Sequence, residues 1–100
     1  MEVKITKEGQ DTFVTLNGRV DTTNAAQFQQ DLTPLFEEEN PKIEIDCTGM
    51  EYTSSQGLRI FLMLQKSVQS HGGSLVLKNM SAQVKEVFDI TGFSNIIRII

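Results

Sequence analysis

The sequence has 100 residues, 39% of them hydrophobic and 22% charged, so one domain is expected over residues 1–100 and two are excluded. A single cysteine, Cys47, excludes both an intramolecular disulfide framework and a multi-cysteine zinc site. The longest apolar run, residues 60–64, is far shorter than the ~20 residues that cross a bilayer, so no membrane insertion is expected.

The charge balance excludes a further class. Thirteen acidic and nine basic residues give a net charge of −4, and the basic residues form no tract. General nucleic-acid binding depends on clustered Lys and Arg that neutralise phosphates, so direct nucleic-acid binding is not expected. The first residues lack the basic and apolar segments of a secretory signal. We therefore expect a cytoplasmic protein.

The first elements are predicted to be two strands and a helix. Residues 3–7 alternate apolar and polar side chains, and residues 12–16 resume the alternation after a turn with Gly9, which predicts an antiparallel hairpin. From Thr22 onward, apolar residues recur every three or four positions, which predicts a helix that ends near residues 35–38. Pro34 is expected to kink this helix or end it early.

The rest of the chain alternates short strands with helices. Strands are predicted at residues 42–47, 74–78 and 96–100, and helices from about Ser55 to Ser70 and from Ser81 to Gly92. The predicted order is thus β-β-α-β-α-β-α-β. Strands that alternate with helices indicate an α/β fold with a mixed, mostly parallel sheet packed against the helices.

Three segments carry a resemblance to a known family. They are Gly-Arg-Val-Asp at 18–21, Tyr-Thr-Ser-Ser-Gln-Gly-Leu-Arg at 52–59, and residues 81–92. In their order and spacing they resemble the STAS domains of bacterial anti-sigma factor antagonists, and the resemblance covers nearly the whole chain. It implies the STAS fold and a protein-interaction switch.

The resemblance assigns the switch to a serine. In that family, the serine two positions before the loop glycine is phosphorylated by a partner that is both a serine kinase and an anti-sigma factor. Here that serine is Ser55 and the glycine is Gly57, with Ser54 as an alternative acceptor. The resemblance implies that the unmodified protein binds the anti-sigma factor and releases the sigma factor. Phosphorylation would abolish this binding, and a serine phosphatase would restore it.

The resemblance also implies which residues contact the partner. They are Asp21, Thr22, Thr53, Ser54, Gln56, Gly57 and Arg59. It implies a monomer that is not an enzyme and needs no cofactor or metal.

A structural interpretation of the same residues stays open. Ser55 is expected at the start of a helix, where free N–H groups and the positive end of the helix dipole favour an anion. However, Thr53 and Gln56 also fit a capping box, in which Thr53 accepts from the helix N–H groups. Asp21 also has a structural interpretation, as a helix N-cap. Asp46, an acidic position that resembles one in the family, has a structural interpretation as a turn or surface residue.

Other functions have less support. The serine segment lacks the first glycine of a nucleophile elbow, and the one histidine, His71, is predicted at the far end of the helix that follows Ser55. A serine hydrolase is therefore not expected. The alternative function is a STAS accessory or ligand-sensing subunit, of a transport or signalling complex, that is not phosphorylated.

Overall fold

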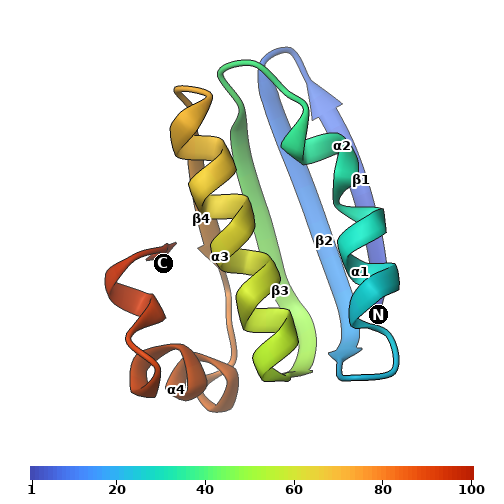
Figure 1. Ribbon diagram of the computed structural model, residues 1–100, viewed down its shortest axis with the longest axis vertical. Coiled ribbons are helices and arrows are strands. Elements are labelled where there is room, and N and C mark those ends of the chain that lie inside the picture. The colour runs from blue at the N-terminus through green and yellow to red at the C-terminus, as the bar shows by residue number, and fades with distance from the viewer.

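The computed structural model describes residues 1–100 and contains one five-stranded sheet with helices against it (Figure 1). The strands lie in the order β1-β2-β3-β4-β5. Their bounds are Glu2–Glu8, Asp11–Val20, Lys42–Thr53, Ser74–Lys78 and Arg98–Ile99. The helices are α1 (Ala25–Asp31), α2 (Thr33–Phe36), α3 (Ser55–Ser70) and α4 (Ala82–Ile90), and a short 3₁₀ helix, η1, spans Phe93–Asn95.

The sheet is mixed, as predicted. β1 and β2 form an antiparallel hairpin, and β3, β4 and β5 each pair in parallel with the strand before them. Each parallel connection carries a helix, which is the usual way to join parallel strands. β2, β3 and β4 therefore all run toward the lower edge of the sheet in Figure 1, where α3 and α4 begin. β2 and β3 end at this edge, whereas β4 ends higher, beside Asp46 of β3. The predicted α/β class and element order are confirmed.

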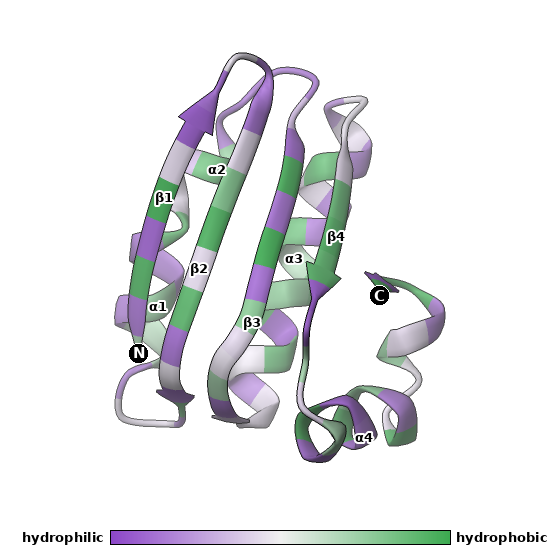
Figure 2. Ribbon diagram, turned by 180° about the vertical axis from the view of Figure 1, so that it is seen from behind, coloured by the Kyte–Doolittle hydropathy of each residue, from purple (hydrophilic) through white to green (hydrophobic).

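Alternation along the strands separates a buried face from an open one. The helices α1, α2 and α3 cover one face of the sheet, and the view from behind shows the other face with the strands in front (Figure 2). In β3, Ile43, Ile45 and Cys47 are buried in the core, while Glu44 and Asp46 alternate with them. This period of two is what a half-buried strand requires.

A row of three phenylalanines joins the helices in the core. Phe28 of α1 and Phe61 of α3 meet edge to face, with ring centroids 5.5 Å apart. Phe61 also contacts Phe88 of α4, at 5.7 Å. All three side chains are buried, and Phe61 has no exposed surface. Aromatic pairs in this geometry add to the stabilisation that comes from apolar burial.

The predicted first helix is divided into α1 and α2. The backbone leaves the first helix at Leu32, and Pro34 lies in the first turn of α2. Because proline has no N–H, it is tolerated in a first turn and not within a helix. The break therefore lies where Pro34 predicted it.

Three strand boundaries were predicted wrongly. β2 continues to Val20, beyond the predicted end at Leu16. β3 continues to Thr53, beyond the predicted end at Cys47, because the end of β2 keeps pairing with it across two irregularities in register. A Cβ on Gly49 would lie 2.0 Å from the Asn17 side-chain oxygen, so this glycine allows close strand approach and does not end the strand. β5 covers only Arg98–Ile99, because the Ile97 N–H bonds to the carbonyl of Phe93 in η1.

The phenylalanine row predicts where a substitution destabilises the domain most. Phe61→Ala should lower the free energy of unfolding by about 3–5 kcal/mol, because it leaves a cavity between two other rings. Met63→Ala, on the same helix but 38% exposed, should change it by less than about 1 kcal/mol. Urea unfolding followed by circular dichroism measures both, and equal losses would contradict the assigned core.

Candidate functional site

The predicted site residues meet where β2 and β3 end and α3 begins. Val20 and Thr53 are register partners at the ends of their strands, and the Ser54 N–H donates to the Val20 carbonyl at 2.9 Å. The segments at 18–21 and 52–59 are therefore neighbours in space. The carboxyl ends of parallel strands are the usual position for sites in sheets of this kind.

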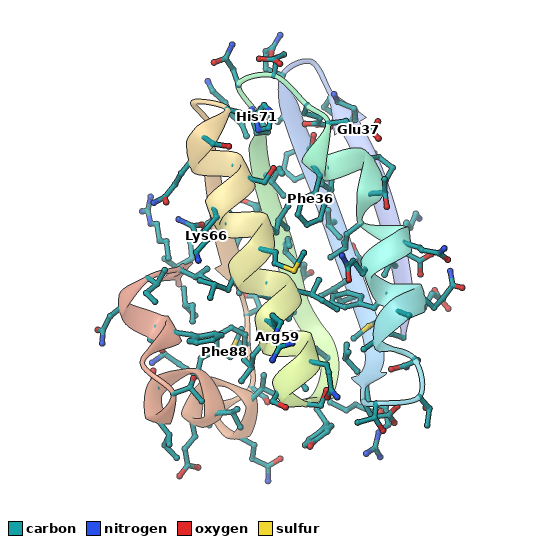
Figure 3. All side chains as sticks on the ribbon, viewed as in Figure 1. Phe36, Glu37, Arg59, Lys66, His71 and Phe88 are labelled. Atoms are coloured by element: carbon teal, nitrogen blue, oxygen red, sulfur yellow. The ribbon has the colours of Figure 1, made fainter.

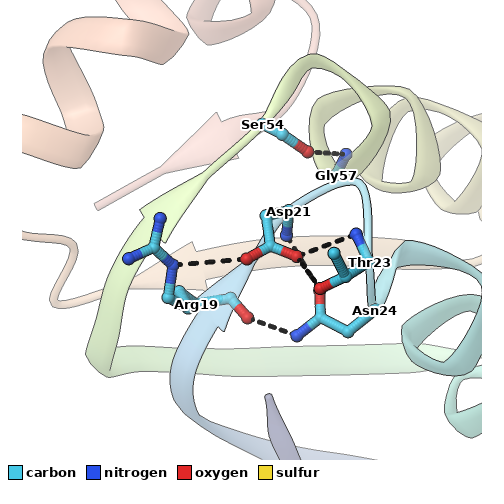
Figure 4. Close-up of polar contacts among 6 residues, drawn as sticks. All are labelled: Arg19, Asp21, Thr23, Asn24, Ser54 and Gly57. Carbon is cyan, nitrogen blue, oxygen red and sulfur yellow. Dashed lines mark hydrogen bonds and ion pairs between the residues drawn. The ribbon is translucent and has the colours of Figure 1, made fainter.

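Ser54 is the residue that caps α3. Its backbone is extended, and its Oγ accepts a hydrogen bond from the Gly57 N–H at 3.3 Å (Figure 4). The Ser54 side chain lies inside the fold, since the residue is only 9% exposed. This is the ordinary N-cap arrangement, in which a serine oxygen satisfies a free helix N–H.

The predicted capping box of Thr53 and Gln56 is wrong. Thr53 is the last residue of β3, is 3% exposed, and donates its hydroxyl to the Ser54 carbonyl at 3.2 Å. Gln56 is exposed and makes no hydrogen bond through its side chain to another residue. Because β3 runs one residue further than a Thr53 cap would allow, the capping position moves to Ser54.

Ser55 differs from its neighbour in every respect that matters for modification. It is the first residue of α3, it is exposed, and its hydroxyl has no hydrogen-bond partner in the protein. An enzyme can therefore reach the Ser55 hydroxyl without breaking a contact of the fold. The same reaction on Ser54 would remove the helix cap.

Gly57 permits the close contact between α3 and the strand ends. A Cβ at this position would lie 2.2 Å from Thr53 Oγ1 and 3.0 Å from Val20 Cγ1. Any side chain would push the first turn of α3 away from β2 and β3. The glycine is buried, and so it shapes the site from beneath.

Asp21 closes the loop between β2 and α1. Its Oδ1 accepts from the Thr23 hydroxyl at 2.5 Å and from the Thr23 N–H at 2.9 Å, and its Oδ2 faces the Arg19 Nε at 3.5 Å (Figure 4). The pKa of this carboxyl is held below its usual range, first by the Thr23 hydroxyl and then by the Thr23 N–H and the Arg19 charge. The alternative prediction, that Asp21 caps α1 through its side chain, is wrong, because the carboxylate accepts from Thr23 and from no N–H of the helix.

Asn24 fixes the same loop from the other side. Its Oδ1 accepts from the Asp21 N–H and its Nδ2 donates to the Arg19 carbonyl, both at 2.8 Å. Asn24 occupies the N-cap position of α1 but makes no capping bond through its side chain. Thr22 lies between these residues, exposed and without a hydrogen-bond partner. The loop therefore holds Asp21 rigidly beside the start of α3.

Arg19 and Tyr52 form a pair that sequence reasoning missed. They are register partners in β2 and β3, and the Arg19 guanidinium lies over the Tyr52 ring, 5.1 Å from its centre. Tyr52 is 44% exposed. The pair depends on β3 continuing past Gly49, which the sequence pattern did not predict.

A shallow hollow of about 220 Å³ lies between α1 and the first half of α3. Arg59 and Gln56 line it and are both exposed. Figure 3 shows Arg59 near the start of α3, on the same end of the helix as the site. The remaining lining residues are Ala25, Ala26, Gln29, Ile60 and Met63.

The other candidates lie outside the site. His71 is at the opposite end of α3 from Ser55. Burial, and then the charge of Asp46, raise the pKa of the Cys47 thiol to about 12, so it behaves as a small core residue. Asp46 accepts from Thr48 in β3 and from Asn79, which directly follows β4. No three His, Cys, Asp or Glu residues are grouped as metal ligands, and no helix is long and apolar enough to cross a membrane.

Fold and site define the protein as an α/β domain with a polar helix start at the carboxyl edge of its sheet. The STAS domain family model matches residues 2–100, and the chain belongs to this family. The anti-sigma-B factor antagonist of Bacillus subtilis is 33% identical over 99 residues, which cover 99% of this chain and 90% of that protein.

Solved structures share the fold at lower identity. A STAS domain protein from Planctomyces limnophilus has a TM-score of 0.84 and 20% identity, covering 98% of this chain and 87% of that one. The anti-sigma factor antagonist SpoIIAA in its unphosphorylated form has a TM-score of 0.80 and 18% identity, covering 99% and 88%. These structures match the mixed five-stranded sheet and its helices.

The two adjacent serines should differ in their effect on stability. Ser54→Ala should lower the free energy of unfolding by about 1 kcal/mol, because the Gly57 N–H loses its acceptor. Ser55→Ala should change it by less than about 0.5 kcal/mol, because that side chain is exposed and unbonded. Urea titration measures both, and a larger loss for Ser55→Ala would contradict the cap assignment.

The hydrogen-bonded loop at Asp21 predicts that the stability of the fold depends on pH. Because its pKa is lowered in the folded state, the turn stabilises the fold above about pH 4, and the stabilisation is lost as the pH falls through the folded pKa. Thr23→Val should raise the Asp21 pKa toward its ordinary value, since it removes the hydroxyl donor. Carboxyl NMR titration measures this. Thr22→Val is the matched control, and an equal change there would contradict the assignment.

Proposed function

We propose that this protein is an anti-sigma factor antagonist, switched off by phosphorylation of Ser55. The observation that carries the proposal is the contrast between two adjacent serines. Ser55 offers an exposed and unbonded hydroxyl, while Ser54 is buried and caps α3. The relative from Bacillus subtilis, which aligns with 99% of the chain, supports the antagonist role by its name. A phosphorylated form of a structural neighbour, SpoIIAA, has also been solved.

The start of α3 suits a switch that acts without unfolding. A phosphate on Ser55 would add about −1.5 to −2 charges at a helix start, where the dipole and free N–H groups favour an anion. The cap on Ser54 would stay intact, because its hydroxyl takes no part. When a partner covers this surface, the same charge would be desolvated and would repel acidic groups. Binding would therefore be lost while the fold persists.

The proposed partner is an anti-sigma factor that is also a serine kinase, and a serine phosphatase would reset the switch. Among the predicted contact residues, the exposed Thr22, Gln56 and Arg59 would touch the partner directly. Asp21 is half-buried, and would hold the neighbouring loop in shape. Thr53, Ser54 and Gly57 are buried and would act by positioning Ser55. We place the protein in the cytoplasm as a monomeric, single-domain regulator without catalytic activity.

Incubation with the cognate kinase and ATP tests the proposal. Mass spectrometry should find one phosphate on the wild-type chain, and site mapping should place it on Ser55. Ser55→Ala should take up none, whereas Ser54→Ala should still be modified despite its lower stability. Loss of modification in Ser54→Ala but not in Ser55→Ala would contradict the assignment.

Binding measurements give the second readout of the same experiment. The unmodified chain should bind the anti-sigma factor, and phosphorylation or Ser55→Asp should weaken this binding at least tenfold. Ser55→Ala serves as the control that keeps the neutral surface. Equal binding before and after modification would instead favour an accessory subunit that is not switched.

A further inference from the structure

Arg59 is the charged side chain that α3 places one turn after Ser55. α3 is continuous from Ser55 to Ser70, so these residues are an i, i+4 pair on one face of the helix. Side chains at this spacing are neighbours, with Cβ atoms about 5–6 Å apart. Both side chains are exposed, so neither is held by the core.

The guanidinium of Arg59 has no anionic partner in the unmodified protein. The ion pairs of the structure use Lys7, Arg19, Lys78 and Lys85, and Arg59 takes part in none of them or in any hydrogen bond. Arg19, which also lies at this end of the sheet, is already held by the Asp21 carboxylate and the Tyr52 ring. Arg59 is thus the uncommitted arginine near the switch.

Neither α3 nor the hollow beside Arg59 contains a competing carboxylate. α3 carries no acidic residue anywhere along its length. The hollow between α1 and α3 is lined by alanines, glutamines and apolar side chains besides Arg59 itself. The small side chains of Ala25 and Ala26 leave space in which the arginine can change its rotamer. An anion added on this face could therefore pair with Arg59 without displacing another partner.

We propose that Arg59 forms an intramolecular ion pair with the phosphate once Ser55 is phosphorylated, an inference that rests on the proposed function. An anion that precedes a cation at i, i+4 is the favourable order along a helix. Arginine can also bind two phosphate oxygens at once through its planar guanidinium. Phosphorylation then changes the partner surface twice, because it adds a dianion and withdraws Arg59 from intermolecular contacts.

Phosphoserine placed at position 55 by synthesis or by genetic encoding tests the pair directly. No kinase is needed, so failure of this inference is separate from failure of Ser55 as a kinase substrate. ³¹P NMR titration of the full chain gives the second pKa of the phosphate. Arg59→Gln should raise this pKa by roughly half a pH unit, because the dianion loses its nearest cation. Arg59→Lys should keep part of the shift.

Lys66→Gln is the matched control, since it removes a positive charge from the exposed surface of the same helix further from Ser55. It should leave the phosphate pKa nearly unchanged. The other charged groups at this end, Arg19, Glu51 and Asp21, are present in every variant, so their effects cancel in the comparison. An equal phosphate pKa in the wild type and Arg59→Gln, with both folded by circular dichroism, would overturn the inference. A similar rise of the phosphate pKa in Lys66→Gln would show a general effect of charge instead of a pair with Arg59, and it would also overturn the inference.

Discussion

The contact between the first turn of α3 and the end of β2 organises the site. The Ser54 N–H bonds to the Val20 carbonyl, and Gly57 packs without a side chain against Val20 and Thr53. This contact turns Ser54 inward as the cap, and the following residue then faces solvent. The accessibility of Ser55 is therefore a consequence of backbone packing, and it needs no special loop.

A rigid site is well suited to regulation by charge. The loop beside Ser55 is held by backbone N–H groups that donate to the side chains of Asp21 and Asn24, and α3 is anchored in the core through Phe61. A covalent phosphate on such a surface changes its electrostatics more than its shape. The proposed pair with Arg59 follows the same principle, because it needs only a rotamer change on an exposed helix face.

Sequence patterns predicted some elements accurately and others poorly. The bounds of α3 and β4 were predicted closely, because helix periodicity and strand alternation are local signals. The end of β3 was missed, because Gly49 resembles a turn glycine until Asn17 of β2 is seen to pack against it. The cap was consequently placed on Thr53, and the Arg19–Tyr52 pair was not foreseen.

The order of strands and helices and the short segment proposed to carry the switch follow from residues that are near one another in the chain, and the family follows from three short segments in their order along it. Which of Ser54 and Ser55 is available for modification does not. That choice depends on where β3 stops, and β3 stops where its pairing with β2 stops. Pairing between distant segments is a property of the folded sheet, and so the exposed serine and its free arginine become visible only in three dimensions.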